Sequence, residues 1–185
     1  MVAMTTITPP LTRSYVVDTD HSSFGFAVRH MGVSLFRGAF RDVAATVATD
    51  ERGGLSITGS APVEGIDVRS PVDLREHLLG DDFFAAARHP EIAFATTEAA
   101  VPREDGTIAV RGLLTIRNVT REVVAVGTWT APVEDPFGGV RAALELTATV
   151  DRRDYGMVWQ LPLPKGGDAL GTAVQITAHL ELIAG

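Results

Sequence analysis

The chain contains no cysteine, which excludes disulfide bonds, thiol nucleophiles and zinc sites built on thiolates. It also lacks any run of basic residues, and its 16 Lys and Arg against 23 Asp and Glu give a net charge of −7. An acidic chain of this kind is not expected to bind nucleic acid or an anionic membrane surface. No stretch approaches the roughly 18 apolar residues of a membrane span, so we expect no membrane insertion.

The N-terminal sequence MVAMTTITPPLTRSY has neither the basic start nor the apolar run of a signal peptide, which predicts a cytoplasmic protein. We expect residues 1–13 to form a loose leader and residues 14–185 to form a single domain. A domain of this length is large enough to bury a substantial hydrophobic core.

Alternation of apolar residues with polar or small ones dominates the chain, and this pattern is typical of β-strands. It predicts strands over residues 14–18, 24–30, 35–49, 55–65, 91–100, 107–116, 119–131, 144–150 and 174–182. Arg117 and Asn118 separate two of these strands, which predicts a tight hairpin. Many strands with little helix indicate an all-β sandwich or a closed barrel, and closure would remove exposed sheet edges.

The segment between Arg69 and Phe94 interrupts the strand pattern. Short helices are predicted over residues 72–79 and 81–87, because Ser70-Pro71 suits a helix start and Gly80 a helix end. Helices this short need packing to persist, so we expect them on the sheet or over its open end. The proline- and glycine-rich residues 159–171 predict a loop between the last strands.

Motifs for catalysis are scarce. The chain has no Gly-x-Ser-x-Gly elbow, and Gly166-Gly167 lacks the spacing of a phosphate-binding loop. The acids of the helical segment are numerous, but surface charge and helix capping explain them better than a glycosidase pair does. We therefore expect a protein that is not an enzyme and has no catalytic residues, and a hydrolytic enzyme remains the alternative.

Asp18, Asp20 and His21 lie together after the first predicted strand, and carboxylates and imidazoles suit divalent metals. A turn stabilised by the carboxylates is the better explanation, because no local His pair has ligand spacing. Structural roles for the histidines are favoured over metal binding, and polar contact with the head group of a ligand is a third reading. A histidine-dependent metal site would draw on His21, His30, His77 or His89.

The aromatic residues are mostly phenylalanine, with eight Phe against two Tyr and two Trp. On the predicted strands these rings alternate with Gly and Ala, so some positions facing the interior of a barrel would be under-filled. A barrel of about eight strands is wide enough to hold one small ligand. A fully packed core is equally consistent with the alternation, and in that case the outer face would serve as an interaction module.

Several motifs in order resemble the YceI-like family over about residues 15–183. They are Asp18-x-Asp20-His21-Ser22, Phe24-x-Phe26-x-Val28-x-His30-Met31, Gly38-x-Phe40, Leu74-Arg75-Glu76-His77-Leu78, Asp82-Phe83-Phe84, His89-Pro90-x-Ile92-x-Phe94, Gly112-x-Leu114-Thr115-Ile116, Val119-Thr120, Arg153 with Asp154-Tyr155-Gly156, and Gly171-x-x-Val174-x-Ile176. The resemblance implies an extended, lipocalin-like antiparallel barrel of about eight strands.

The resemblance also implies a carrier that holds a polyisoprenoid, an isoprenoid quinone or a similar long amphiphile in a hydrophobic tunnel, with no other cofactor and no metal. An apolar tunnel with a few polar groups at one end suits such a ligand. Family analogy further suggests a homodimer. The expected ligand-binding residues are Phe24, Phe26, Val28, His30, Phe40, Arg75, His77, Phe83, Phe84 and Leu114. Arg75 and His77 would either contact a polar head or tie the helical cap to the barrel.

Overall fold

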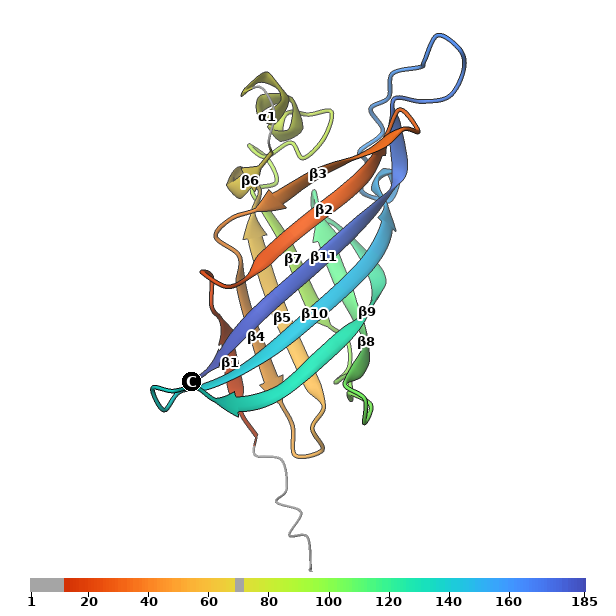
Figure 1. Ribbon diagram of the computed structural model, residues 1–185. Coiled ribbons are helices and arrows are strands. Elements are labelled where there is room, and N and C mark those ends of the chain that lie inside the picture. The colour runs from red at the N-terminus through yellow and green to blue at the C-terminus, as the bar shows by residue number, and fades with distance from the viewer. Residues whose placement is uncertain (1–11, 69–71) are drawn as a thin grey trace, which may run out of the picture.

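The computed structural model describes residues 12–68 and 72–185, and it is built almost entirely of antiparallel strands with one short α-helix at one end (Figure 1). The elements are β1 (Ser14–Val17), β2 (Ser23–His30), β3 (Ser34–Phe40), β4 (Ala44–Thr49), β5 (Leu55–Pro62), η1 (Val63–Gly65), β6 (Ile66–Asp67), α1 (Val72–Leu79), β7 (Glu91–Thr96), β8 (Thr107–Ile116), β9 (Val119–Glu134), β10 (Val140–Asp151), η2 (Arg152–Tyr155) and β11 (Leu170–Ala184).

The strands form one sheet in the order β1-β4-β5-β7-β8-β9-β10-β11-β2-β3-β6. β1 also pairs with β11, with Tyr15 opposite Ala184, and this contact closes the run from β1 to β11 into an eight-stranded barrel. The prediction of an all-β antiparallel barrel of about eight strands is therefore confirmed.

The two ends of the barrel differ in width. One edge of β11 pairs with β10 over most of its length, whereas the other edge pairs with two different strands. Near its C-terminal end β11 pairs with β1, whereas its first two-thirds pair with β2 from Leu170 to His179. β2 in turn carries β3 and the two-residue β6, so extra strands are inserted into the wall at the end that α1 covers. A barrel widens as strands are added.

Two hydrophobic clusters follow this division. The narrow end, called the packed end below, is filled by the fully buried Tyr15, Val47, Leu55, Leu144 and Leu182. The wide end, called the hollow end, is lined by a second cluster that is rich in phenylalanine and extends up to α1.

The structure shortens the predicted strands 55–65 and 91–100, since β5 ends at Pro62 and β7 at Thr96, and it corrects two further elements. The predicted strand 35–49 is broken at Asp42, which has a φ of 59° and turns the chain from β3 to β4. The predicted helix 81–87 is a series of turns, because the amides of Phe84 and Ala86 donate to the carbonyls of Leu78 and Leu79 at the end of α1. The segment therefore folds back to satisfy the helix C-terminus instead of continuing as a helix.

Other local predictions are confirmed. α1 spans Val72–Leu79, and Arg117 and Asn118, both with positive φ, form the tight turn between β8 and β9. The proposed helix start at Ser70-Pro71 and most of the predicted leader, residues 1–11, lie outside the described residues. Among the helices of the described ranges, none is long and apolar enough to cross a membrane.

Candidate functional site

Two cavities lie in series inside the barrel. The larger, of about 270 Å³, occupies the hollow end, and a second of about 110 Å³ lies deeper, toward the packed end. Phe24, Ile92 and Ile176 line both, so the two spaces adjoin across these three side chains. Together they form the tunnel discussed below.

The wall of the tunnel is almost wholly apolar. Among the described residues that line the larger cavity, the titratable side chains are His30, His77 and Arg152. The deeper cavity is lined by aliphatic residues, small residues and two phenylalanines, with Ser60 as its polar side chain. Such a lining suits an extended hydrocarbon and offers few partners to a polar molecule.

Several phenylalanine rings of the tunnel wall pack against one another. Phe40 contacts the rings of Phe24, Phe26 and Phe84 with centroid distances of 5.6 to 5.9 Å. The ring of Phe26 lies over Gly38, its cross-strand partner, where an added Cβ would sit 2.5 Å from the ring. Glycine at this position therefore lets the ring lie against the sheet and away from the centre.

The mouth of the tunnel is its opening at the hollow end. It is covered by a cap, which consists of α1, the turns that follow it and Trp159. His77 of α1 packs edge-on against Phe83 and Trp159, with centroid distances of 5.0 and 5.2 Å, and its Nε2 lies 3.0 Å from Asp82 Oδ2. Trp159 belongs to the loop that joins η2 to β11. The cap thus joins the helical segment to this loop across the mouth.

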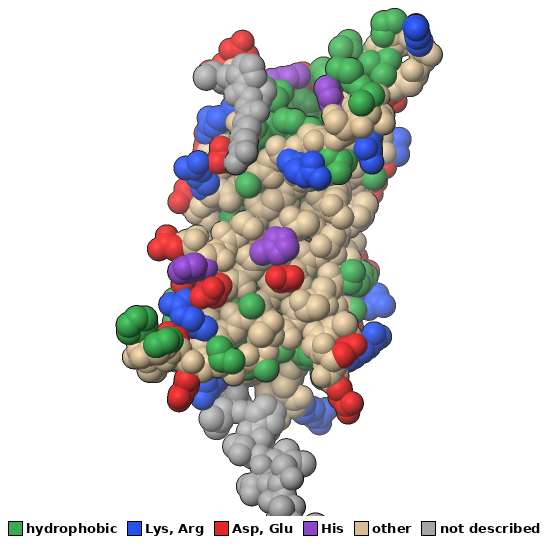
Figure 2. Space-filling view, in the orientation of Figure 1, with side chains coloured by type: hydrophobic (Ala, Val, Ile, Leu, Met, Phe, Trp, Pro, Cys, Tyr) green, Lys and Arg blue, Asp and Glu red, His purple; other side chains and the backbone are tan. Residues whose placement is uncertain are grey.

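Exposed apolar side chains lie at the mouth on the side opposite α1 (Figure 2). The turn between β2 and β3 exposes Val33. The loop of residues 156–169 before β11, called the projecting loop below, exposes Val158 and Leu161. Figure 2 shows hydrophobic side chains gathered on this loop and in the hollow beside it. Part of the border of the tunnel mouth is therefore apolar surface.

The structure places most of the expected ligand-binding residues on the tunnel and leaves one away from it. The nine that line a cavity are Phe24, Phe26, Val28, His30, Phe40, His77, Phe83, Phe84 and Leu114. Arg75 lines neither cavity: its guanidinium donates to the carbonyls of Glu64 and Ile66 and pairs with the Glu64 carboxylate. It ties α1 to the chain that follows β5, which is the tethering alternative foreseen for this residue.

Arg152 is a lining residue that the sequence reasoning missed. Its side chain is only 3% exposed, and it donates to the carbonyls of Met157, Leu170 and Gly171 at the two ends of the projecting loop. Burial lowers the pKa of its guanidinium, which nevertheless stays charged. The alternation of Leu144, Leu146, Ala148 and Val150 toward the interior continues to position 152, and this was the available signal.

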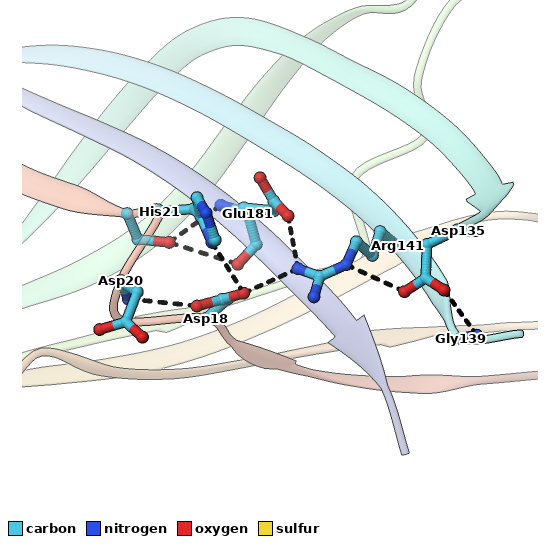
Figure 3. Close-up of polar contacts among 8 residues, drawn as sticks. Asp18, Asp20, His21, Asp135, Gly139, Arg141 and Glu181 are labelled. Carbon is cyan, nitrogen blue, oxygen red and sulfur yellow. Dashed lines mark hydrogen bonds and ion pairs between the residues drawn. The ribbon is translucent and has the colours of Figure 1, made fainter. Parts of the chain in front are cut away.

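A polar network lies on the outside of the barrel where β1, β11 and β10 meet (Figure 3). Arg141 donates to Asp18, Asp135 and Glu181, and His21 Nδ1 lies 3.1 Å from Asp18 Oδ2. The Arg141 guanidinium, with a smaller effect from His21, lowers the pKa of Asp18 to about 2. The hydrogen bond between His21 and Asp18 also raises the pKa of His21. The network links β10, β11 and the residues after β1 at the place where β1 pairs with β11 and closes the barrel. This place is called the seam below.

Asp18, His21 and Glu181 are the one group in the described residues whose potential metal-ligand atoms lie within 4.8 Å of one another. Arg141 already supplies a positive charge to both carboxylates, so the network is satisfied by the chain itself. The remaining candidates are dispersed: His30 and His77 lie on the tunnel, and the buried Nδ1 of His89 has no hydrogen-bond partner within the described ranges. Within the described residues, the histidines other than His21 therefore belong to no group of potential metal ligands.

Comparison with protein families finds a match to the YceI-like domain over residues 15–182. Similar proteins include a UPF0312 protein of Shewanella sp. (strain W3-18-1), 29% identical over 80% of this chain and 78% of its own, and one of Vibrio cholerae (strain ATCC 39541), 30% identical over 77% of each.

Solved structures share the fold. BcnA of Burkholderia cenocepacia aligns with a TM-score of 0.73 and 21% identity, covering 89% of this chain and 98% of BcnA. A polyisoprenoid-binding domain from Saccharophagus degradans, implicated in plant cell wall breakdown, aligns with a TM-score of 0.59 and 11% identity, covering 95% of this chain and all of that domain.

Proposed function

Because the chain belongs to the YceI-like family, we propose that it binds a long-chain isoprenoid-type lipid in the tunnel. The hydrocarbon tail extends past Phe24 and Ile176 toward the packed end, and the polar head stays near the mouth. In this role the protein is a carrier and not an enzyme. We expect the complex to need no cofactor besides the lipid.

One observation carries the proposal: two adjoining apolar cavities lie in line beneath a cap, in a barrel whose other end is filled by side chains. A long, thin and apolar ligand matches such a space, because it buries hydrocarbon along its length without leaving polar groups unpaired. A compact polar substrate would find few hydrogen-bond partners in the same wall.

The fold shared with the Saccharophagus degradans domain supports the ligand class, since that domain is named for polyisoprenoid binding. The alternative hypothesis, an enzyme or a metal-binding protein, has weaker support. The histidines that it needs are dispersed, and the acidic side chains near His21 already bind Arg141. The filled-core reading has weaker support as well, since the hollow end contains open space.

The purified protein, analysed by native mass spectrometry and after organic extraction, tests the proposal. We expect a co-purifying lipid whose fragmentation gives isoprene units, or, after delipidation, stoichiometric uptake of added geranylgeraniol. A stoichiometric metal ion in place of lipid would support the metal reading. Delipidated protein that takes up neither geranylgeraniol nor a metal would favour the interaction module.

A further inference from the structure

Arg152 stands out in the tunnel because it is a buried cation in an apolar wall. It lines the larger cavity together with Met157, Trp159 and Leu170, and only 3% of it is exposed. Its partners are three backbone carbonyls, which carry no net charge. Within the described residues, no carboxylate forms an ion pair with it.

The charges of Asp151 and Asp168 favour the charged form of Arg152, but neither carboxylate forms an ion pair with it. Asp151 holds Arg153 through three hydrogen bonds from that side chain, and Asp168 is exposed on the projecting loop. Charges in protein interiors are ordinarily paired, because removing an ion from water is costly. Hydrogen bonds to three carbonyls satisfy N–H donors but supply no counter-charge, so the charge itself calls for an explanation.

Arg152 also lies at the end of the tunnel where a ligand head is expected. It directly follows β10 at the hollow end, and the larger cavity that it lines also includes His30 and His77. A guanidinium has more N–H groups than its three carbonyl acceptors engage, and its planar fork suits phosphate and carboxylate oxygens.

Resting on the proposed lipid-binding function, we propose that Arg152 selects ligands with a compact anionic head, a phosphate or a carboxylate, on an isoprenoid tail. The head oxygens accept hydrogen bonds from the free N–H groups of the guanidinium, and the negative charge supplies the missing counter-ion inside the cavity. A neutral head of the same tail gives up this charge-assisted contact.

Titrations of the delipidated protein with three ligands of one tail length test the proposal: geranylgeranyl phosphate, geranylgeranoic acid and geranylgeraniol. We expect the wild type to bind at least one anion about tenfold more tightly than the alcohol. Preference for the phosphate alone identifies a phosphate head, and preference for both anions extends the site to carboxylates. Equal affinity for all three overturns the proposal while leaving the lipid-binding function intact.

Substitutions at Arg152 separate the effect of its charge from its role in holding the projecting loop. Arg152→Gln should abolish the anion preference and keep alcohol binding, and Arg152→Lys should retain part of the preference. Arg117→Gln is the matched control, because Arg117 also donates to a loop carbonyl, that of Gly156, yet is only half-buried and lines neither cavity. If Arg152→Gln does not fold, the wild-type preference alone decides. If none of the three ligands binds, the proposed function itself fails.

Discussion

The two ends of this barrel share strands but not the way their interiors are filled. At the packed end, Leu144 and Leu182 are fully buried in a tight cluster around Tyr15. At the hollow end, phenylalanine rings lie along the wall and leave a cavity of about 270 Å³. The insertion of β2, β3 and β6 beside β11 widens only one end. The stability core and the binding site are thereby separated within one sheet.

The largest expected effect compares two leucines, one at each end. Leu144→Ala leaves a new void in close packing and should lower the free energy of unfolding by about 3 to 5 kcal/mol. Leu78→Ala, on the cap, should cost about 1 to 2 kcal/mol, because Leu78 already faces a cavity on one side. Urea unfolding of both variants measures the difference, and equal losses would contradict the division into two ends.

Blocking the tunnel should affect binding more than stability. Ile176 lines both cavities, so Ile176→Trp should lower affinity for geranylgeraniol by about tenfold or more while the melting temperature changes little. Val124→Trp, on the exposed outer wall, is the control and should bind normally. Normal binding by Ile176→Trp would place the ligand outside the tunnel.

A smaller effect is expected where a glycine keeps a ring against the wall. Gly38→Ala brings a methyl group against Phe26 and should push that ring into the tunnel, weakening geranylgeraniol binding severalfold. Adding Phe26→Leu to Gly38→Ala should recover part of the affinity, because the shorter side chain clears the new methyl group. A double-mutant cycle measures this coupling, and additive effects would refute the mechanism.

The smallest effect concerns the polar network of Asp18, His21 and Arg141 at the seam, where β1, β10 and β11 meet. The pKa of Asp18 is lowered to about 2, so its contribution to stability is complete above its unfolded value of 3.8 and is lost as the pH falls toward 2. The pKa of His21 is raised, so its contribution is complete below 6.5 and is lost as the pH rises through the raised value.

Asp18→Asn should flatten both arms of this profile, because Asp18 is the titrating group in the first shift and the hydrogen-bond partner of His21 in the second. Melting temperature measured against pH checks the effect, with Asp20→Asn as the control, since Asp20 contributes only its backbone amide to Asp18. An unchanged profile in Asp18→Asn would show that other groups govern the pH dependence.

Most of the fold could be predicted from local sequence patterns. The predictions failed where contacts with residues distant in the sequence determine the local structure. Alternation identified the strands, and Arg117-Asn118 identified a hairpin, because both signals are local. The turn at Asp42 depends on β3 and β4 pairing with different strands, which alternation cannot reveal. Residues 81–87 have a helical composition, but their amides are drawn to the end of α1.

The candidate site divides in the same way. The phenylalanines of β2 were predictable as tunnel residues because strand alternation faces them inward. Arg75 has the charge of a head-group ligand, but the carbonyls of Glu64 and Ile66 hold it outside the cavities. Arg152 was missed because a charged residue at a strand end suggests solvent, whereas the loop folds over it.

The two tryptophans give the most direct test of where the ligand binds, because one lies at each end. Trp159 lines the larger cavity, whereas Trp129 packs on Tyr15 at the packed end and lines neither cavity. In a geranylgeraniol titration, the Trp129→Phe variant should show a saturable change in Trp159 emission, and Trp159→Phe should show almost none. A change carried by Trp129, or no change in either variant, would contradict a lipid held at the hollow end.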